Sequence, residues 1–111
     1  MSRNVMVKKW LNTKEYKDWA KAVKTRDNYT CIVCGRTEGI IAAHHLIPKN
    51  FKRYRTELDN GVSLCVQHHI FGKFSAHKNP FWFEMFMKEH RPITLLQTKI
   101  KIQDLIDEND L

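Results

Sequence analysis

The cysteines of this chain form two metal-ligand pairs together with one histidine. Cys31 and Cys34 are separated by two residues, and so are Cys65 and His68. Structural zinc binds four thiolate or imidazole ligands in a tetrahedron, and a two-residue gap lets both members of a pair reach one ion. We therefore expect these four side chains to hold a structural Zn²⁺. The alternative is that the cysteines are small buried apolar side chains and His68 lies on the surface.

Two pairs of adjacent histidines accompany these residues. His44 and His45 lie in the segment AHH, and His69 directly follows His68 in QHH. Successive side chains point to opposite faces of a strand, and about 100° apart on a helix. Each pair therefore suits two separate tasks, and a His68 facing zinc leaves His69 for a different neighbour. The alternative is that His44 and His45 are ordinary strand histidines and His69 lies on a helix surface.

Four runs of the sequence resemble the HNH endonuclease family, in the zinc-stabilised form common among phage and restriction enzymes. They are CIVCG, AHHLIP, LDNGVSLC and VQHH, and they cover about residues 26–79. The resemblance implies an α+β fold with a ββα-metal (His-Me finger) core. In that core two short strands and a helix hold one catalytic divalent ion that helps to cleave nucleic-acid phosphodiester bonds.

The same resemblance implies a role for each of four residues. His44 is a ligand of the catalytic ion, and His45 is the general base that takes a proton from the attacking water. Asn60 matches the central asparagine, whose amide braces the loop that carries the base, and His69 matches the final histidine, a second ligand. The chemistry is consistent, because histidine accepts protons near neutral pH and a divalent cation offsets the charge on a reacting phosphate.

The chain departs from the family pattern at two positions. Many relatives have cysteine in place of His68, an exchange that tetrahedral zinc tolerates. Many also have a histidine four residues after the last motif histidine, where this chain has Lys73, and a protonated lysine cannot bind metal. His77 is a candidate replacement ligand, and its alternative is a surface or packing role. For Asn60 the alternative is a simple turn formed with Gly61.

The positive charge of the chain is concentrated in its first half. The net charge is +7, and residues 1–55 contain 13 Lys and Arg against 4 Asp and Glu, whereas residues 56–111 contain 6 against 8. Such a surface attracts nucleic acid or anionic membranes. The loop between the expected strands carries basic residues that would position DNA through its phosphates, with a solvated loop as the alternative. They are Lys49, Lys52, Arg53 and Arg55.

Apolar periodicity predicts the elements that position these residues. A helix is expected over 13–26, with Asn12 and Glu15 as its capping pattern, and strands over 40–46 and 61–64. A helix should begin at Cys65 or Val66, be interrupted over 74–79, and be followed by helices starting at Pro80 and Pro92. The apolar residues of FWFEMFM predict burial on more than one side. We expect one domain, 1–111, with a motif core over about 26–79 and helical flanks over 13–26 and 80–109.

Together these features predict a metal-dependent DNA endonuclease. Its cofactors would be the structural Zn²⁺ and a catalytic divalent ion such as Mg²⁺, Mn²⁺, Ni²⁺ or Zn²⁺. The other reading is a non-catalytic, zinc-containing DNA-binding module. Neither a signal peptide nor an apolar run of about 18 residues is present, so we expect a cytoplasmic protein without membrane contact. The resemblance is compatible with a phage-encoded protein that acts in the host cytoplasm. The sequence leaves the oligomeric state open.

Overall fold

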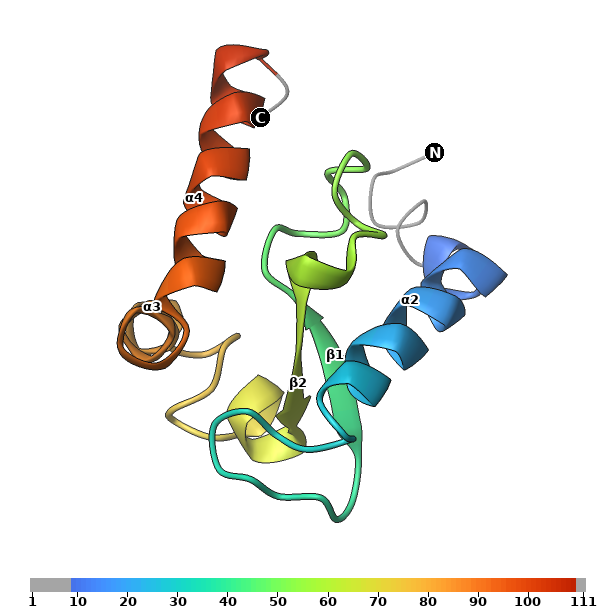
Figure 1. Cartoon of the computed structure of the whole chain (residues 1–111). Coiled ribbons are helices and arrows are strands. Elements are labelled where there is room, and N and C mark those ends of the chain that lie inside the picture. Colours follow the sequence, from blue (N-terminus) through green and yellow to red (C-terminus); the bar gives the residue numbers. More distant parts are fainter. Residues whose placement is uncertain (1–8, 110–111) are drawn as a thin grey trace.

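The computed structural model describes residues 9–109 of the chain. Strands β1 (Ile41–His45) and β2 (Gly61–Cys65) pair antiparallel, with Ile41 opposite Cys65. Helix α2 (Lys14–Arg26) precedes them, the short turns η1 (Leu58–Asn60) and η2 (Gln67–Phe71) flank β2, and α3 (Pro80–His90) and α4 (Pro92–Asp107) follow. The sheet lies between α2 and the α3–α4 pair (Figure 1). This confirms a small α+β domain with helical flanks, and the ends of the expected domain, 1–8 and 110–111, lie outside the described residues.

Helix α2 covers one face of the sheet. Trp19 and Val23 are buried and pack with Ala43 of β1. The helix begins after Thr13, whose side-chain oxygen accepts a hydrogen bond from the Tyr16 amide, so the predicted cap at Asn12 is wrong by one residue. Thr13 takes this position because its hydroxyl lies three residues before a free amide of the first turn.

Gly61 permits the close approach of α2 to β2. A Cβ atom added at this position would lie 2.5 Å from the Trp19 ring and 2.8 Å from Val23. Real carbon atoms do not approach so closely, because the repulsion exceeds any gain from packing. The small residue at the start of β2 therefore determines how near the α2 aromatic side chains come to the end of β1, since Gly61 pairs with His45.

The end of α2 is fixed to β2 by a charged pair. The Asp27 carboxylate accepts hydrogen bonds from Arg26 at 2.9 Å and from the Ser63 amide at 3.0 Å. Arg26 in turn donates to the carbonyls of Leu58 and Gly61. Burial raises the pKa of Asp27, but the hydrogen bonds from Arg26 and Ser63 outweigh it, and the pKa lies below its usual value.

The helix expected after β2 is a single π-helical turn, η2. It ends at Gly72, whose amide donates to the Gln67 carbonyl at 2.8 Å. A Cβ atom at Gly72 would lie 2.6 Å from that carbonyl oxygen, so a larger residue would force this closure open. The chain then turns back, and the Ala76 amide donates to the His68 carbonyl at 2.8 Å. The interruption predicted over 74–79 is confirmed.

Helix α3 is buried on one side only, which corrects the prediction from its apolar sequence. Phe83 and Met87 are buried against the sheet, whereas Phe81 and Met85 are 81% and 71% exposed. The sheet has only two strands, so it covers a single stripe of the helix. Helix α4 packs through Leu105 near the loop after β1. Among residues 9–109, no helix has the length and apolar character needed to cross a bilayer.

Candidate metal-binding and catalytic site

The structure brings the two predicted zinc-ligand pairs together. The ligand atoms of Cys31, Cys34, Cys65 and His68 all lie within 4.8 Å of one another. The Cys34 and Cys65 sulfur atoms are 3.8 Å apart, and Nδ1 of His68 is 3.3 Å from the Cys65 sulfur. Tetrahedral Zn–S bonds of about 2.3 Å place two sulfur atoms about 3.8 Å apart. Both the donor types and their spacing therefore fit one structural zinc ion.

Local backbone structure presents these sulfur atoms. Gly35 has a positive φ, 76°, which glycine adopts without strain, and its amide donates to the Cys31 carbonyl at 2.9 Å. The Ile32 amide donates to the Ser63 carbonyl of β2 at 3.0 Å, which holds the loop against the strand that ends at Cys65. Burial raises the pKa of Cys65, but hydrogen bonds from His68, the other cysteines and Gln67 outweigh it, so the pKa is lowered. A lower pKa favours the thiolate that metal binding requires.

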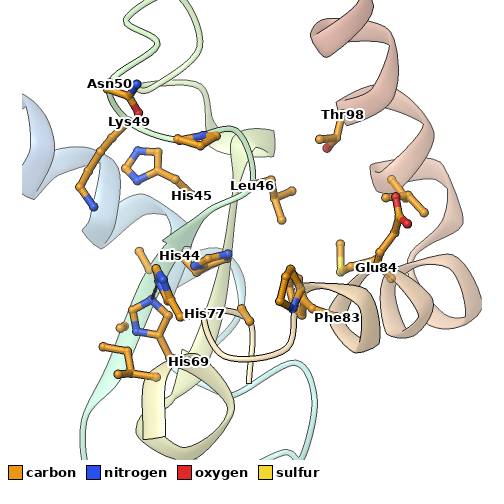
Figure 2. Close-up of a pocket in the computed structure, with 18 of the residues that line it drawn as sticks. His44, His45, Leu46, Lys49, Asn50, His69, His77, Phe83, Glu84 and Thr98 are labelled. Carbon is orange, nitrogen blue, oxygen red and sulfur yellow. Dashed lines mark hydrogen bonds between the residues drawn. The ribbon is translucent and has the colours of Figure 1, made fainter. Parts of the chain in front are cut away.

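A second cluster lies on the other side of η2 and consists of three histidines. His44 from β1, His69 from η2 and His77 from the following loop have ligand nitrogens within 4.8 Å of one another. Nε2 of His69 and Nε2 of His77 are 3.1 Å apart, and the three rings face a common centre (Figure 2). Nitrogen ligands with metal bonds of about 2.1 Å are separated by about 3.0–3.4 Å in octahedral or tetrahedral geometry. The histidine cluster thus fits a divalent ion.

These imidazoles are uncharged at neutral pH. Burial lowers the pKa of His44 to about 3, and the neighbouring His69 and His77 lower it further in the same direction. Burial likewise lowers the pKa of His69 to about 4. A neutral imidazole has a lone pair available for a metal, whereas a protonated one does not. The cluster is therefore ready to bind a cation at physiological pH.

The placement of His77 depends on the turn after Gly72. The His77 amide donates to the His69 carbonyl at 3.1 Å, which sets the two histidines side by side. Ser75, fully buried, donates to the Ile70 carbonyl and accepts from the Lys78 amide, which shapes the turn between them. Lys73 is exposed and is not one of the three clustered residues.

His45 points to the opposite face of β1 from His44, as the strand alternation predicts. Its ring stacks on Trp19 with centroids 3.7 Å apart and planes 11° apart. Nε2 of His45 lies 2.9 Å from the Arg55 carbonyl oxygen, which can only accept, so Nε2 carries the proton and Nδ1 has the free lone pair. Burial lowers the pKa of His45 to about 4, against the opposing effect of this hydrogen bond. His45 is therefore a neutral, oriented proton acceptor.

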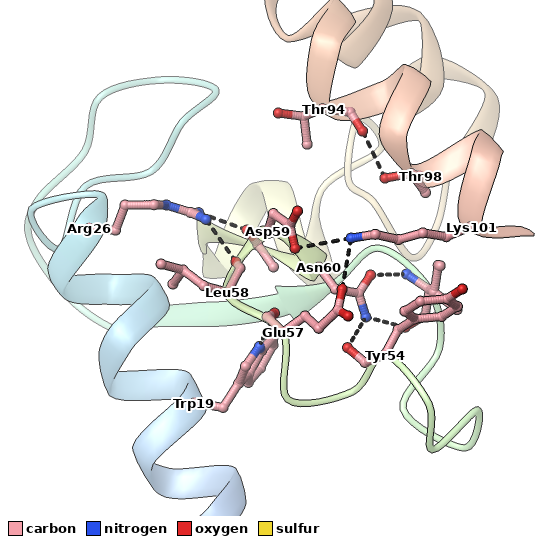
Figure 3. A network of polar contacts seen from close by, with 12 residues as sticks. Trp19, Arg26, Tyr54, Glu57, Leu58, Asp59, Asn60, Thr94, Thr98 and Lys101 are labelled. Carbon is pink, nitrogen blue, oxygen red and sulfur yellow. Dashed lines mark hydrogen bonds and ion pairs between the residues drawn. The ribbon is translucent and has the colours of Figure 1, made fainter.

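Asn60 fastens the loop that orients His45. This residue is 1% exposed, and its Oδ1 accepts from the Ile47 amide at 2.8 Å. Its Nδ2 donates to the carbonyls of Ile47 at 3.2 Å and Tyr54 at 3.1 Å, closing both ends of the loop (Figure 3). Tyr54 directly precedes Arg55, whose carbonyl contacts His45. Asn60 thereby fixes the hydrogen-bond acceptor that sets which nitrogen of His45 carries the proton.

Both flanking helices also hold this loop. From α2, Nε1 of Trp19 donates to the Glu57 carbonyl at 2.7 Å. From α4, Nζ of Lys101 lies 2.9 Å from the Glu57 carboxylate and 3.0 Å from that of Asp59 (Figure 3). The sequence interpretation did not single out Trp19 or Lys101 for the site. Trp19 has the spacing of an ordinary buried helix residue, and nothing local links Lys101 to residues more than forty positions earlier.

The four predicted DNA-contacting residues do not share one environment. Lys49 lines the cavity that contains the histidines, and Lys52 is exposed. Arg53 forms an ion pair with Glu108. The guanidinium of Arg55 lies 4.3 Å from the centre of the Trp10 ring. Lys49 and Lys52 are thus the better placed of the four to meet a ligand in solution.

The histidine cluster and His45 line one cavity of about 990 Å³. The arrangement can bind a cation through three neutral imidazoles and accept a proton at Nδ1 of His45, which lines the same cavity. A separate sulfur-rich cluster can hold a structural ion. Comparison of the chain with protein-family models, curated proteins and solved structures finds no match to any of them.

Proposed function

We propose that this protein is a metal-dependent endonuclease of the HNH type that hydrolyses phosphodiester bonds in DNA. The observation that carries the proposal is the division between His44 and His45. One belongs to a cluster of three imidazoles, and its neighbour is a hydrogen-bonded, uncharged ring on the opposite face of the strand. This pairing of a cation site with a proton acceptor is what hydrolysis of a phosphodiester requires.

His45 takes the proton of the attacking water in this scheme. The Arg55 carbonyl holds the proton of Nε2, so Nδ1 is the nitrogen that receives the new one. As the water oxygen bonds to phosphorus, the bond to the 3′ oxygen breaks, which leaves 5′-phosphate and 3′-hydroxyl ends once the leaving oxygen gains a proton from solvent. The negative phosphate raises the pKa of the nearby imidazole toward the working pH, which strengthens the base.

Three imidazoles, those of His44, His69 and His77, would hold the catalytic ion. When bound, a divalent ion such as Mg²⁺, Mn²⁺, Ni²⁺ or Zn²⁺ supplies Lewis-acid stabilisation of the charge on the reacting phosphate. Trp19 keeps the His45 ring in one plane, and Asn60 keeps its acceptor carbonyl in place. The cysteine cluster with His68 would hold a structural Zn²⁺ that ties the loop near residue 31 to the end of β2.

DNA is the proposed partner because the charge of the chain favours a polyanion. The net charge is +7, and Lys49 lies at the cavity that contains the histidines. Contacts of lysine with phosphates are independent of base sequence and weaken as salt increases. Affinity for DNA should therefore fall steeply between low and moderate salt.

Cleavage of a supercoiled plasmid tests the proposal. The purified protein is incubated with plasmid and Mg²⁺, Mn²⁺, Ni²⁺ or Zn²⁺ in turn, and nicked and linear forms are measured over time. His45→Ala should cut about 10²–10⁴-fold more slowly than the natural protein, which is the usual contribution of a general base. His90→Ala is the matched control, because His90 is exposed at the end of α3, and it should cut at the natural rate.

Two results would contradict the proposal, each at a different point. Cleavage by His45→Ala at the natural rate, with the zinc content of both proteins equal, contradicts the role of His45 as the base. Binding of DNA without cleavage under any of the four ions contradicts the endonuclease activity and supports the non-catalytic DNA-binding module.

A further inference from the structure

The cavity that contains the histidines extends well beyond them. It continues between the loop after β1 and the α3–α4 pair, where its walls are largely apolar. Figure 2 shows the histidines and Lys49 on one side, Leu46 between, and Phe83, Glu84 and Thr98 on the helical side. The apolar wall residues are Leu46, Pro48, Phe83, Met87, Leu95 and Ile102. Hydrolysis at the histidine cluster uses none of these side chains.

The size and character of this extension suit a flat organic group. The whole cavity, including the part at the histidines, has a volume of about 990 Å³, at the upper end of the range for pockets that hold small organic ligands. Water in an apolar cavity has few hydrogen-bond partners, so its replacement by an apolar surface is favourable. The helical wall also carries polar groups. Nζ of Lys99 lies 3.4 Å from the Glu84 carboxylate. The Thr98 hydroxyl donates its proton to the Thr94 carbonyl, so the lone pairs of the hydroxyl oxygen can still accept a hydrogen bond.

Continuity with the histidine cluster identifies the occupant. Phe83 is the link between the two parts, because its ring packs edge-on to His44 with centroids 5.4 Å apart and also lines the apolar wall. A phosphate at the cluster carries a nucleoside on either side, and a nucleobase has apolar faces and polar edges. Such a base matches apolar walls with donors and acceptors at one side.

We propose that the apolar extension of the cavity is a nucleobase pocket, so that the preferred substrate is DNA with an unpaired base beside the scissile phosphate. This inference rests on the proposed function, which places the scissile phosphate at His44, His69 and His77. A base in a matched duplex is stacked and paired and must be extruded before it enters. Extrusion is least costly for a mismatched or single-stranded base, and the pocket therefore selects such substrates.

Binding measurements test the pocket without relying on cleavage. The His45→Ala protein with Mn²⁺ is titrated into two fluorescently labelled duplexes of equal length, one fully matched and one with a single central mismatch, and Kd is measured by anisotropy. The two duplexes carry equal charge, so general phosphate attraction cancels in their ratio. The mismatched duplex should bind about tenfold more tightly, since that ratio corresponds to part of the cost of extrusion.

Two neighbouring leucines of α4 provide the matched variants. Leu95 lines the cavity, whereas Leu96, about 100° further around the helix, is 59% exposed and does not line it. Leu95→Trp fills the pocket, so the Kd values for the matched and mismatched duplexes should become nearly equal. Leu96→Trp should leave the preference for the mismatched duplex near tenfold. If Leu95→Trp loses its bound zinc and melts early, Ile102→Trp fills another part of the same wall.

Equal affinity of the His45→Ala protein for the two duplexes would overturn the proposal of a nucleobase pocket. So would a preference for the mismatched duplex that persists in a folded Leu95→Trp or Ile102→Trp protein. The plasmid assay separates this outcome from failure of the endonuclease proposal. Cleavage with no preference for mismatches contradicts the pocket alone. A mismatch preference without any cleavage supports a base-binding pocket and contradicts the hydrolytic role.

Discussion

At the scale of single residues, the role of the His45 imidazole follows from the partner of its Nε2 nitrogen. The Arg55 carbonyl fixes the proton of His45 on Nε2, and the Asn60 amide in turn holds the loop that contains Arg55. Arg55 and Asn60 thus decide which nitrogen of His45 is free. Orientation of this kind is lost more easily than the fold itself, because it depends on a few directed hydrogen bonds.

Replacement of Asn60 should therefore affect both stability and rate. Asn60→Ala removes three buried hydrogen bonds and leaves the Ile47 amide without its partner, at a cost of about 1–3 kcal/mol in the free energy of unfolding. The cleavage rate at saturating DNA should fall while the affinity for DNA is unchanged, because the loop carbonyl loses its position. A variant with full kcat, measured well below its melting temperature, would contradict this role.

Asp27 provides a pH-dependent test of the anchor between α2 and β2. Its pKa is lowered in the folded protein, so its contribution to stability is present above the unfolded value of 3.8 and is lost as the pH falls through the lower folded pKa. Asp27→Asn should destabilise the protein by about 1.5–3 kcal/mol at pH 7, and the difference should shrink below about pH 4. Urea unfolding at pH 7 and below about pH 4 measures the difference in the free energy of unfolding between Asp27→Asn and the natural protein.

Asp18→Asn is the matched control for this measurement, because Asp18 is an exposed residue of the same helix whose ion pair with Lys14 lies in solvent. Exposed pairs contribute little, so its effect should remain below about 1 kcal/mol at any pH. An Asp27→Asn protein as stable as this control at pH 7 would show that the anchor is unimportant.

At the scale of elements, the site is held by helices that surround the two strands. Trp19 of α2 contacts both the His45 ring and the loop, and Lys101 of α4 reaches the same loop from the other side. Gly61 lets α2 approach, because a side chain there would occupy the space of the Trp19 ring. His45 is therefore positioned by packing between elements as much as by its own strand.

Gly61→Ala tests this packing. The added methyl group would displace the Trp19 ring, so we expect a loss of about 1–3 kcal/mol in stability, a changed tryptophan fluorescence spectrum and slower cleavage. Circular dichroism and fluorescence-monitored melting measure the first two effects. A variant with unchanged melting temperature and spectrum would mean that α2 has room to move away without consequence.

Periodicity predicted these elements well and their connections poorly. The strands and the helices at Thr13, Pro80 and Pro92 follow from apolar spacing and from Pro, whose ring favours a helix start. The place of His77 could not be predicted, because it depends on Gly72 closing η2 and on a turn held by Ser75. Apolar content likewise overstated the burial of α3, since a sequence does not show how few strands lie beneath a helix.

At the scale of the whole molecule, two clusters of side chains close enough to hold a metal ion meet at η2. Adjacent residues of this turn, His68 and His69, belong to different clusters. The sulfur-rich cluster connects the loop near residue 31 to β2 in a chain whose core is small. Substitutions in the two clusters should therefore have different effects. Those in the sulfur-rich cluster should lower stability, and those in the histidine cluster should lower cleavage.

Loss of a residue of the sulfur-rich cluster should lower the stability of the protein, and any effect on cleavage should follow from that loss of stability. Cys34→Ser changes an exposed ligand, so any effect on stability comes from metal binding and not from core packing. We expect this variant to lose zinc on dialysis and to melt at least about 10 °C lower, because the binding energy of structural zinc is folding energy. Elemental analysis and calorimetry measure the two effects. His69→Ala, which alters the other cluster, should keep its zinc and lose cleavage.

Anomalous diffraction from crystals soaked in Mn²⁺ would locate both ions. We expect an anomalous peak within metal-bond distance of ring nitrogens of His44, His69 and His77, separate from a zinc peak among Cys31, Cys34, Cys65 and His68. The manganese peak should be absent from crystals of His69→Ala. A single peak at the cysteines, with no density at the three histidines at high Mn²⁺ concentration, would contradict this expectation.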